Sequence, residues 1–596
     1  ISIIPACASV AALWPALRKP TTRSRTPCII SCPVQKPVLQ PYCLMGDASG
    51  VEAALRGWVQ AAGGYVSPAV SLMAELGGGE RGVRAVSAIR AGQQLCVVPQ
   101  RLCIFMPPPG SDPCTTGASS FIPDTEGDFV AAGSYLRAAA TGLNPFLATT
   151  LLLMHEAGKG ASAPRQPYLA TLPEEVGNLA SWSAAERRAL AGTSIAAADV
   201  ALQGIFEEDV SPLLAGGGDL WPPTQRTFEA FRHAYGLVQS RGFRMQQENW
   251  VTGEVSQGDE LYLLCAIDML NHSSRPERIN TELAKIDDTM SIDLPSGERA
   301  EFTGFFGVTA ARDIREGEEL LLSYGPLGDS ELLRMYGFVE QHPDGFANPH
   351  SKVLITYNEL LVACRTSVSE VGADEAMEEK EQLLAEIGLT GPVFTLGMPP
   401  DGSAAARLPD DMVTAMIVLH MPEEHFQDAK TELAAPALHG SGPLRLGEDY
   451  FQYMEEEAFR AMMGMLTRLF DTHIRELDRE EPAGAPGDMP YREKCARHVA
   501  QTERALFVLF KKAVLQHLVL WQGASDSEAG SSDEEERVSE SCEEEDAEGG
   551  EGEGGRDAAP SEGESSDGSS GDSASLSSGG SKGAVRPPLK KAKQQG

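Results

Sequence analysis

Polar residues interrupt two apolar segments of this sequence, and their types are those that bind ligands or take part in reactions. In the first, "LYLLCAIDML" runs into Asn271 and His272, with Asp268 four residues before the histidine. In the second, "LLLSYGPLGDSELLRMYGF" carries Tyr324 and Tyr336, each followed by glycine. A buried polar side chain costs free energy unless it has a hydrogen-bonding partner. We therefore expect Asn271 and His272 to bind the protein's own backbone, a metal or a ligand.

Neither metal binding nor hydrolysis is well supported by the residues around His272. A metal site requires further ligands at suitable spacing, but His155 and His233 are remote in sequence and no HExxH motif occurs. Asp268 and His272 could serve a hydrolase, yet no GxSxG nucleophile motif lies near them in the sequence. Taken alone, this segment is explained better by ordinary core packing than by a binding site.

A glycine-rich segment, "LGGGERG" at 76–82, superficially suggests a phosphate-binding loop. Such a loop follows a strand and precedes a helix, and the ATP-binding form ends in Lys-Ser/Thr. Here a strand-like segment, "VRAVSAI", follows instead, and the Lys-Ser/Thr pair is absent. We therefore reject a phosphate-binding loop, although glycine still lets the backbone approach a ligand closely.

The elements that must position these residues alternate between helix and strand patterns. "VEAALRGWVQAAGG" (51–64) and "NPFLATTLLLMHEAGKG" (144–160) predict helices, the second capped by Asn144 with Pro145 at its first position. Residues 180–245 carry a helical pattern interrupted by "AGGGDLWPP", and strand patterns return at 260–270 and 301–323. Residues from about 350 to 521 predict mostly helices, the last of them ending at Trp521.

One short pattern occurs twice. "AVSAIRAGQQLCVVPQ" and "AARDIREGEELLLSYG" both spell Ile-Arg-x-Gly-x-x-Leu. Each reads as two strands around a turn, the first turn at Ala91–Gly92. We interpret the echo as one strand–turn–strand unit used twice and not as a repeat array.

Taken together and in order, five segments resemble the SET-domain methyltransferases. They are "GERGVRAVSAIRAGQQLCVVP", "QPYLATLP", "AYGLVQSRGF", "DMLNHSS" and "SYGPLGDSELLRMYGFVEQHPDGFANPHSKVLI". More narrowly, they are similar to the branch containing the RuBisCO large-subunit, ribosomal-protein and actin-histidine methyltransferases. The resemblance covers roughly residues 50–520. It implies an α+β fold of small β-sheets, with a knot-like threading that brings the "NH" strand and the "YGF" segment together.

The resemblance and the composition divide the chain into four parts. A SET domain is expected at 50–345 with a helical insertion at about 105–255, followed by an all-α substrate-binding domain at 350–522. Residues 523–596 are rich in Glu, Ser and Gly and end in a basic cluster, which predicts a disordered acidic tail. Residues 1–44 contain no Asp or Glu, which is typical of a transit peptide, although a non-coding extension explains them equally well.

The activity that the resemblance implies is transfer of methyl from S-adenosylmethionine to the side-chain amine of a lysine in a protein. This chemistry needs no metal. It requires a neutral amine, although free lysine has a pKa of ~10.4, alignment of the reacting atoms, and oxygens aimed at the positive charge. Two alternatives stay open: a protein-histidine N-methyltransferase on the same scaffold, and a non-catalytic SET scaffold that binds basic proteins through its acidic tail.

The resemblance also implies roles for individual residues. Tyr324 would be catalytic, with its hydroxyl beside the reacting methyl and amine. The cofactor-binding residues would be Glu80, Arg81, Gly82, Arg241, Asn271, His272 and Phe338. The substrate-binding residues would be Arg241, Asp268, Tyr324 and Tyr336. Two positions depart from the family pattern, because Arg81 stands where relatives tend to carry an apolar residue and Asp329 stands where asparagine is common.

Composition limits the partners and the compartment. The formal net charge of −36 over 596 residues argues against nucleic acid, because phosphate binding depends on Lys and Arg. We expect a monomer that acts on a protein, with RuBisCO, a ribosomal protein, a histone or another protein all open. No apolar run reaches the ~20 residues of a membrane helix, and the 11 scattered cysteines indicate reduced thiols. The compartment is the chloroplast if residues 1–44 are translated, and otherwise the cytoplasm or nucleus.

Overall fold

The computed structural model describes residues 4–5, 48–77, 80–106, 126–139, 143–248, 255–294, 296–297, 299–340, 347–371, 376–391, 393–398, 406–434, 446–478 and 489–535. The chain divides into two units, Ile1–Ser527 and Glu528–Gly596, and the fold that follows belongs to the first, apart from residues 528–535 at the end of the last helix. Apart from the two-residue strand β1 (Ile4–Pro5), the segment predicted to be a transit peptide or extension lies outside the described residues. So does the predicted acidic tail beyond Glu535.

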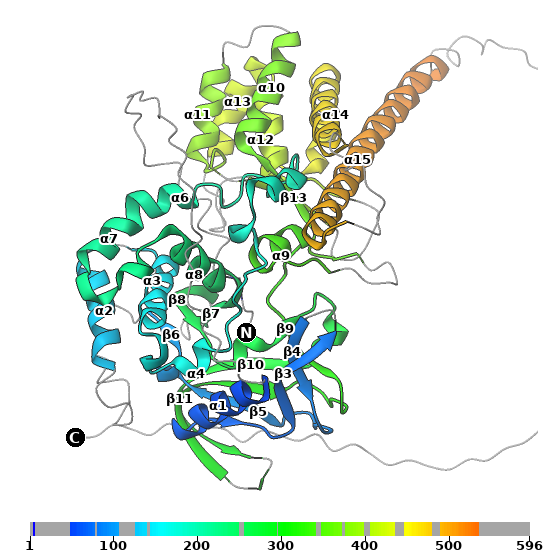
Figure 1. Ribbon diagram of the computed structural model, residues 1–596. Coiled ribbons are helices and arrows are strands. Elements are labelled where there is room, and N and C mark those ends of the chain that lie inside the picture. Colours follow the sequence, from blue (N-terminus) through cyan, green and yellow to red (C-terminus); the bar gives the residue numbers. More distant parts are fainter. Residues whose placement is uncertain are drawn as a thin grey trace, which may run out of the picture. The chain divides into compact units, whose positions relative to one another are not determined.

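Three four-stranded sheets form most of the strand part of the described fold. The first orders its strands β10 (Thr281–Asp293), β11 (Arg299–Ala310), β5 (Gln94–Pro99) and β2 (Tyr65–Val66). The second orders β3 (Val70–Gly77), β4 (Glu80–Ala85), β12 (Glu319–Leu322) and β9 (Asn271–His272). The third orders β1, β7 (Gly242–Glu248), β8 (Val255–Leu263) and β6 (Ile104–Phe105). Strands from early and late parts of the sequence therefore lie side by side, as Figure 1 shows for the blue and green strands.

The two Ile-Arg-x-Gly segments meet in the structure. Ile89 and Ile314 form an isolated antiparallel bridge, in which each backbone N–H donates to the other's carbonyl at 2.9 Å. Around this bridge, β4 pairs with β12 and β5 pairs with β11. Each sheet thus combines the first strand of one copy with the second strand of the other. The predicted strand–turn–strand units are confirmed, but neither closes on itself as a hairpin.

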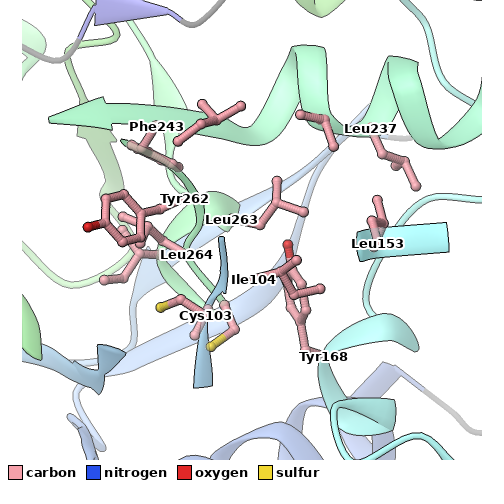
Figure 2. Packing of buried hydrophobic residues seen from close by; sticks show 14 of the residues in the cluster. Cys103, Ile104, Leu153, Tyr168, Leu237, Phe243, Tyr262, Leu263 and Leu264 are labelled. Atoms are coloured by element: carbon pink, nitrogen blue, oxygen red, sulfur yellow. The ribbon is translucent and has the colours of Figure 1, made fainter. Parts of the chain in front are cut away.

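Helices separate the early strands from β7 and β8. They are α2 (Glu126–Ala139), α3 (Pro145–Gly158), α4 (Gln166–Leu169), α5 (Ala184–Arg187), α6 (Leu202–Ile205), α7 (Ser211–Gly216) and α8 (Phe228–Arg241). Asn144 caps α3 as predicted, because its side chain accepts a hydrogen bond from Phe146 N at 2.8 Å. Figure 2 shows Leu153 and Leu237 from two of these helices beside Ile104 and Leu263 of the sheet. The helix α1 (Ala48–Ala61) matches the helix predicted over 51–64.

The C-terminal region is helical, as the sequence predicts, and has its own buried core. Its helices are α10 (Tyr357–Val371), α11 (Met377–Glu386), α12 (Asp410–His420), α13 (Glu423–Ala434), α14 (Glu456–Asp478) and α15 (Tyr491–Glu535). Strands β13 (Lys352–Thr356) and β14 (Val393–Gly397) add one antiparallel pair that the sequence did not predict. The prediction that the last helix ends at Trp521 is wrong, because α15 continues to Glu535 and no proline interrupts it.

Two further properties concern the described residues alone. The cysteines at 96, 103, 265, 364 and 495 are free and buried, as expected of reduced thiols. None of the described helices combines the length and the apolar character that a membrane crossing needs.

Candidate active site

The sequence suggested that the polar pair Asn271–His272 ends one long strand, but in the structure it does not. Strand β8 ends at Leu263, and a 3-10 turn at Ile267–Met269 intervenes. Ala266 adopts φ = 67°, a left-handed conformation that costs free energy for a residue with a Cβ. The turn then leads into β9, which runs parallel to β12 with His272 opposite Leu322. The pair therefore lies beside the segment that leads to Tyr324.

Asn271 holds strand β4 at close range. Its Nδ2 donates to the carbonyl of Arg81 at 3.0 Å and to Glu319 Oε1 at 2.9 Å. A Cβ on Gly82 would lie 2.6 Å from this Nδ2 and 2.7 Å from Leu76 Cδ1, so no larger residue fits without movement. The sequence left open whether Asn271 binds the protein's own backbone, a metal or a ligand. In the structure, the backbone of Arg81 is one of its partners.

His272 contacts Tyr324 in two ways. Its Nδ1 accepts a hydrogen bond from the backbone N–H of Tyr324 at 3.0 Å, and the two rings stack with centroids 5.0 Å apart. The Leu322 carbonyl, which can only accept, lies farther from Nδ1, at 3.4 Å. The shorter contact with Tyr324 N–H therefore decides the tautomer, and the proton of the neutral ring belongs on Nε2, which lies 3.3 Å from Ser274 Oγ. Burial lowers the pKa of His272, although the charge of Glu340 opposes this shift. A neutral histidine thus positions the tyrosine.

The hydroxyl of Tyr324 is fixed by backbone. It donates to the carbonyl of Leu270 at 2.6 Å, and burial raises the pKa of the phenol above its usual value. The ring centroids of Tyr336 and Tyr324 lie 4.7 Å apart, and those of Phe338 and Tyr336 lie 6.2 Å apart. A phenol that keeps its proton is no general base, but its oxygen still offers electron density to a positive group.

Gly337 explains why the second tyrosine is followed by glycine. It ends α9 (Asp329–Tyr336) with φ = 84°, the left-handed conformation that favours glycine. A Cβ at this position would also lie 2.4 Å from the backbone carbon of Gly177. The turn places Phe338 directly after the helix that carries Tyr336.

The side chain of Asp268, in the turn before Asn271, has two polar partners. Its Oδ2 accepts from Tyr168 Oη at 2.8 Å and pairs with Arg241 Nη1 at 3.3 Å. Burial raises the pKa of Asp268, while the charge of Arg241 and the Tyr168 hydrogen bond act in the opposite direction. The other oxygen, Oδ1, is buried and accepts no hydrogen bond from the described residues. Such an oxygen is suited to receive a donor from a bound group.

The structure brings most of the predicted site residues together. Asn271, His272, Tyr324, Tyr336 and Phe338 form one connected group, and Asp268 and Arg241 lie at the turn that leads into it. Of the remaining predicted residues, Gly82 contacts this group, whereas Glu80 and Arg81 have exposed side chains on β4. Glu80 and Arg81 could therefore bind a cofactor only through their backbone, as predicted for this segment.

Sequence reasoning missed Tyr168. It is fully buried in α4, and its hydroxyl meets Asp268 across 100 positions of sequence. Burial raises its pKa far above the usual value, so it donates the hydrogen bond over the whole physiological range. The segment "QPYLATLP" was part of the family resemblance, and its tyrosine was the available signal.

Comparison with known proteins agrees with this geometry. The model of the SET domain family matches residues 80–325. Residues 80–325 form a SET domain. The matched range contains the turn at Asp268, the β9–β12 pair and Tyr324, and it stops before Tyr336 and Phe338.

Among curated proteins, the chain is similar to the N-lysine methyltransferase SETD6 of Mus musculus, with 24% identity over 69% of this chain and 81% of that protein. It is also similar to SETD6 of Homo sapiens, with 25% identity over 59% of this chain and 66% of that protein. Among solved structures, Rubisco LSMT bound to AdoMet superposes with a TM-score of 0.52, 16% identity and coverage of 78% of this chain and 92% of that one. The SET domain of LSMT bound to lysine and AdoHcy gives the same TM-score at 15% identity, covering 79% of this chain and 92% of that one. These likenesses establish the SET fold and confirm the family resemblance of the sequence.

Proposed function

We propose that this protein is an S-adenosylmethionine-dependent protein-lysine N-methyltransferase. The observation that carries the proposal is the placement of Tyr324, whose hydroxyl is fixed on Leu270 O while its ring stacks on His272 and faces Tyr336. The SET fold and similarity to N-lysine methyltransferases support the same conclusion.

The described residues fit the cofactor. The missing side chain at Gly82 lets Asn271 approach the backbone of β4, and Asn271 fixes that strand through Arg81 O. We propose that the backbone at Glu80–Gly82, the side chains of Asn271 and Arg241, and the ring of Phe338 hold S-adenosylmethionine, with His272 packed behind Tyr324. When bound, this cofactor supplies an electrophilic methyl group on a positively charged sulfur.

The oxygens around Tyr324 match what methyl transfer requires of the protein. The phenol keeps its proton and donates a hydrogen bond to Leu270 O, so the lone pairs of its oxygen stay available toward a positive methyl group. The oxygen is held before any reaction begins, because its partner is backbone and its ring is packed on two others. Preorganised oxygens of this kind stabilise developing charge without reorganisation.

We propose that the target side chain enters between Tyr336 and Asp268. Aromatic walls attract a cationic amine on arrival, and burial favours its neutral form, which is the nucleophile. The buried Oδ1 of Asp268 can accept a hydrogen bond from this amine or from the group that delivers it. Arg241 keeps the carboxylate in place from the other side. The substrate is a protein, and we propose that the helical region at 350–522 binds it.

Labelled methyl transfer tests the proposal. The protein is incubated with a cell lysate and S-adenosylmethionine carrying an isotope-labelled methyl group, and modified peptides are sequenced by mass spectrometry. We expect label on lysine, and loss of label with retained cofactor binding for Tyr324→Phe. Label on histidine would instead establish the histidine methyltransferase. Absence of cofactor binding in calorimetry would overturn both and favour the scaffold.

A further inference from the structure

The first turns of α15 dock on the SET domain and its helical insertion. The buried residues Cys495, Val499 and Glu503 of α15 are four positions apart, so they lie on one face of the helix. They join a buried cluster of residues from both regions: Leu179, Trp182, Leu190, Ile195, Leu333, Cys495, Ala496 and Val499. Beside it, the buried carboxylate of Glu503 accepts hydrogen bonds from Ser194 N at 2.8 Å and Ser194 Oγ at 2.5 Å.

One polar contact links this helix to the reactive part of the SET domain. His498 Nε2 lies 2.8 Å from Asp329 Oδ2, and the side chain of Asp329 is only 2% exposed. The other carboxylate oxygen of Asp329 accepts from Glu340 N at 3.3 Å and from Asn348 Nδ2 at 3.2 Å. An ionised carboxylate only accepts, so His498 must donate from Nε2, whereas an asparagine could instead turn its NH₂ toward Nε2 and reverse this hydrogen bond. The departure from the family pattern at position 329 thus fixes His498 as the donor.

Two routes lead from Asp329 to residues of the candidate site, one to Tyr336 and one to His272. Along the chain, Asp329 is the first residue of α9 and Tyr336 is the last. Through hydrogen bonds, Glu340 connects the contact to the histidine of the site, because its Oε2 accepts from Ser274 N at 2.7 Å and Ser274 Oγ lies 3.3 Å from His272 Nε2.

We propose that His498 is a positioning residue for methyl transfer. Its contact with Asp329 holds α9 and the Glu340–Ser274 segment, and these hold Tyr336 and His272 in register with Tyr324. Docking of α15 thereby sets the geometry at the reacting atoms without touching them. This inference rests on the proposed methyltransferase function.

Kinetics of matched variants test it. In His498→Ala, we expect kcat to fall about tenfold, because small displacements at reacting groups cost rate steeply, while the KM for S-adenosylmethionine changes less than twofold. Gln at 498 keeps an N–H donor and should restore most of kcat. Lys512→Ala, an exposed change on the same helix, is the control and should leave kcat unchanged. An unchanged kcat in His498→Ala, or a loss that Gln does not restore, would overturn the positioning role.

A spectroscopic readout separates this inference from the proposed function. With ¹⁵N-labelled histidine, the ring nitrogens of His272 should report an Nε2–H tautomer in the wild type, and their signals should shift in His498→Ala but not in Lys512→Ala. If the wild type transfers no methyl but the His272 signals shift in His498→Ala, the contact between His498 and the site is supported and the methyltransferase function is refuted. If the wild type transfers methyl and His498→Ala changes neither kcat nor the signals, the positioning role of His498 is refuted and the methyltransferase function is supported.

Discussion

The backbone N–H of Tyr324 donates to Nδ1 of His272 at 3.0 Å, and the imidazole stacks on the phenol at an interplanar angle of 20°. The histidine therefore acts on the tyrosine as an acceptor and as a packing surface, and only its neutral form can accept at Nδ1. This relationship assigns His272 to the orientation of Tyr324 and makes an acid–base role for the imidazole unnecessary.

Replacing His272 should separate its two contributions. His272→Ala removes the acceptor and the ring, so the partly buried N–H of Tyr324 is left without this partner, at a cost of about 1 kcal/mol. His272→Asn keeps an acceptor oxygen near Nδ1 and loses only the stacked ring. We expect urea unfolding to show the larger loss of stability for Ala, and methyl transfer to fall in both. Equal stability of the two variants would show that the hydrogen bond contributes nothing.

Gly82→Ala should disturb the strand that Asn271 holds. The new Cβ would lie 2.6 Å from Asn271 Nδ2 and 2.7 Å from Leu76 Cδ1, and such overpacking costs about 1–3 kcal/mol. We expect a lower unfolding free energy and weaker binding of S-adenosylmethionine in calorimetry.

A second glycine provides the control for Gly82→Ala. Gly57 lies within α1, exposed and with no atom within 4 Å of a new Cβ, so Gly57→Ala should be neutral or stabilising, by up to about 1 kcal/mol. Similar losses in both variants would indicate a general intolerance of the fold and not a specific close approach.

The site residues were expected from the family resemblance that several short motifs carry together, and what the sequence failed to predict has physical causes. The strand toward Asn271 was overextended because residues 261–267 are buried throughout, so hydrophobicity does not mark the break at Ala266. Tyr168 was missed because it joins Asp268 from a distant helix, and a single tyrosine carries no periodic signal. The His498–Asp329 contact spans 169 positions, and no local pattern encodes it. Motifs whose residues are adjacent in sequence were predictable, whereas contacts made by docking of distant elements were not.

Tyr168→Phe should move the acidic limb of the pH–rate profile. The hydroxyl of Tyr168 donates to Asp268 Oδ2 and favours the carboxylate, so removing it raises the pKa of Asp268 further. We expect the acidic limb of kcat/KM to shift to higher pH, with rates at high pH largely retained.

Tyr135→Phe is the matched control for this change. The Tyr135 hydroxyl donates to Leu213 O at 2.8 Å within the helical insertion, away from Asp268. Its loss should lower stability by about 1 kcal/mol and leave the pH profile in place. A profile unchanged in Tyr168→Phe would mean that Asp268 does not control the acidic limb.

Glu503 should make the stability of the protein decrease as pH rises toward neutrality. Burial raises the pKa of Glu503 from 4.5 to about 7, although two hydrogen bonds from Ser194 oppose the shift. The folded state therefore binds this proton more tightly than the unfolded state. Its contribution to stability is complete below pH 4.5 and is lost as pH rises through about 7, at a cost of roughly 3 kcal/mol.

Glu503→Gln removes this titration and keeps groups that can bond Ser194. Urea unfolding of wild type and variant at pH 5 and pH 8 isolates the effect, because other titrating groups are common to both proteins. We expect the variant to gain stability relative to the wild type between pH 5 and pH 8. If the difference between the two proteins is the same at both values, Glu503 is charged throughout, and its hydrogen bonds with Ser194 outweigh the cost of burial.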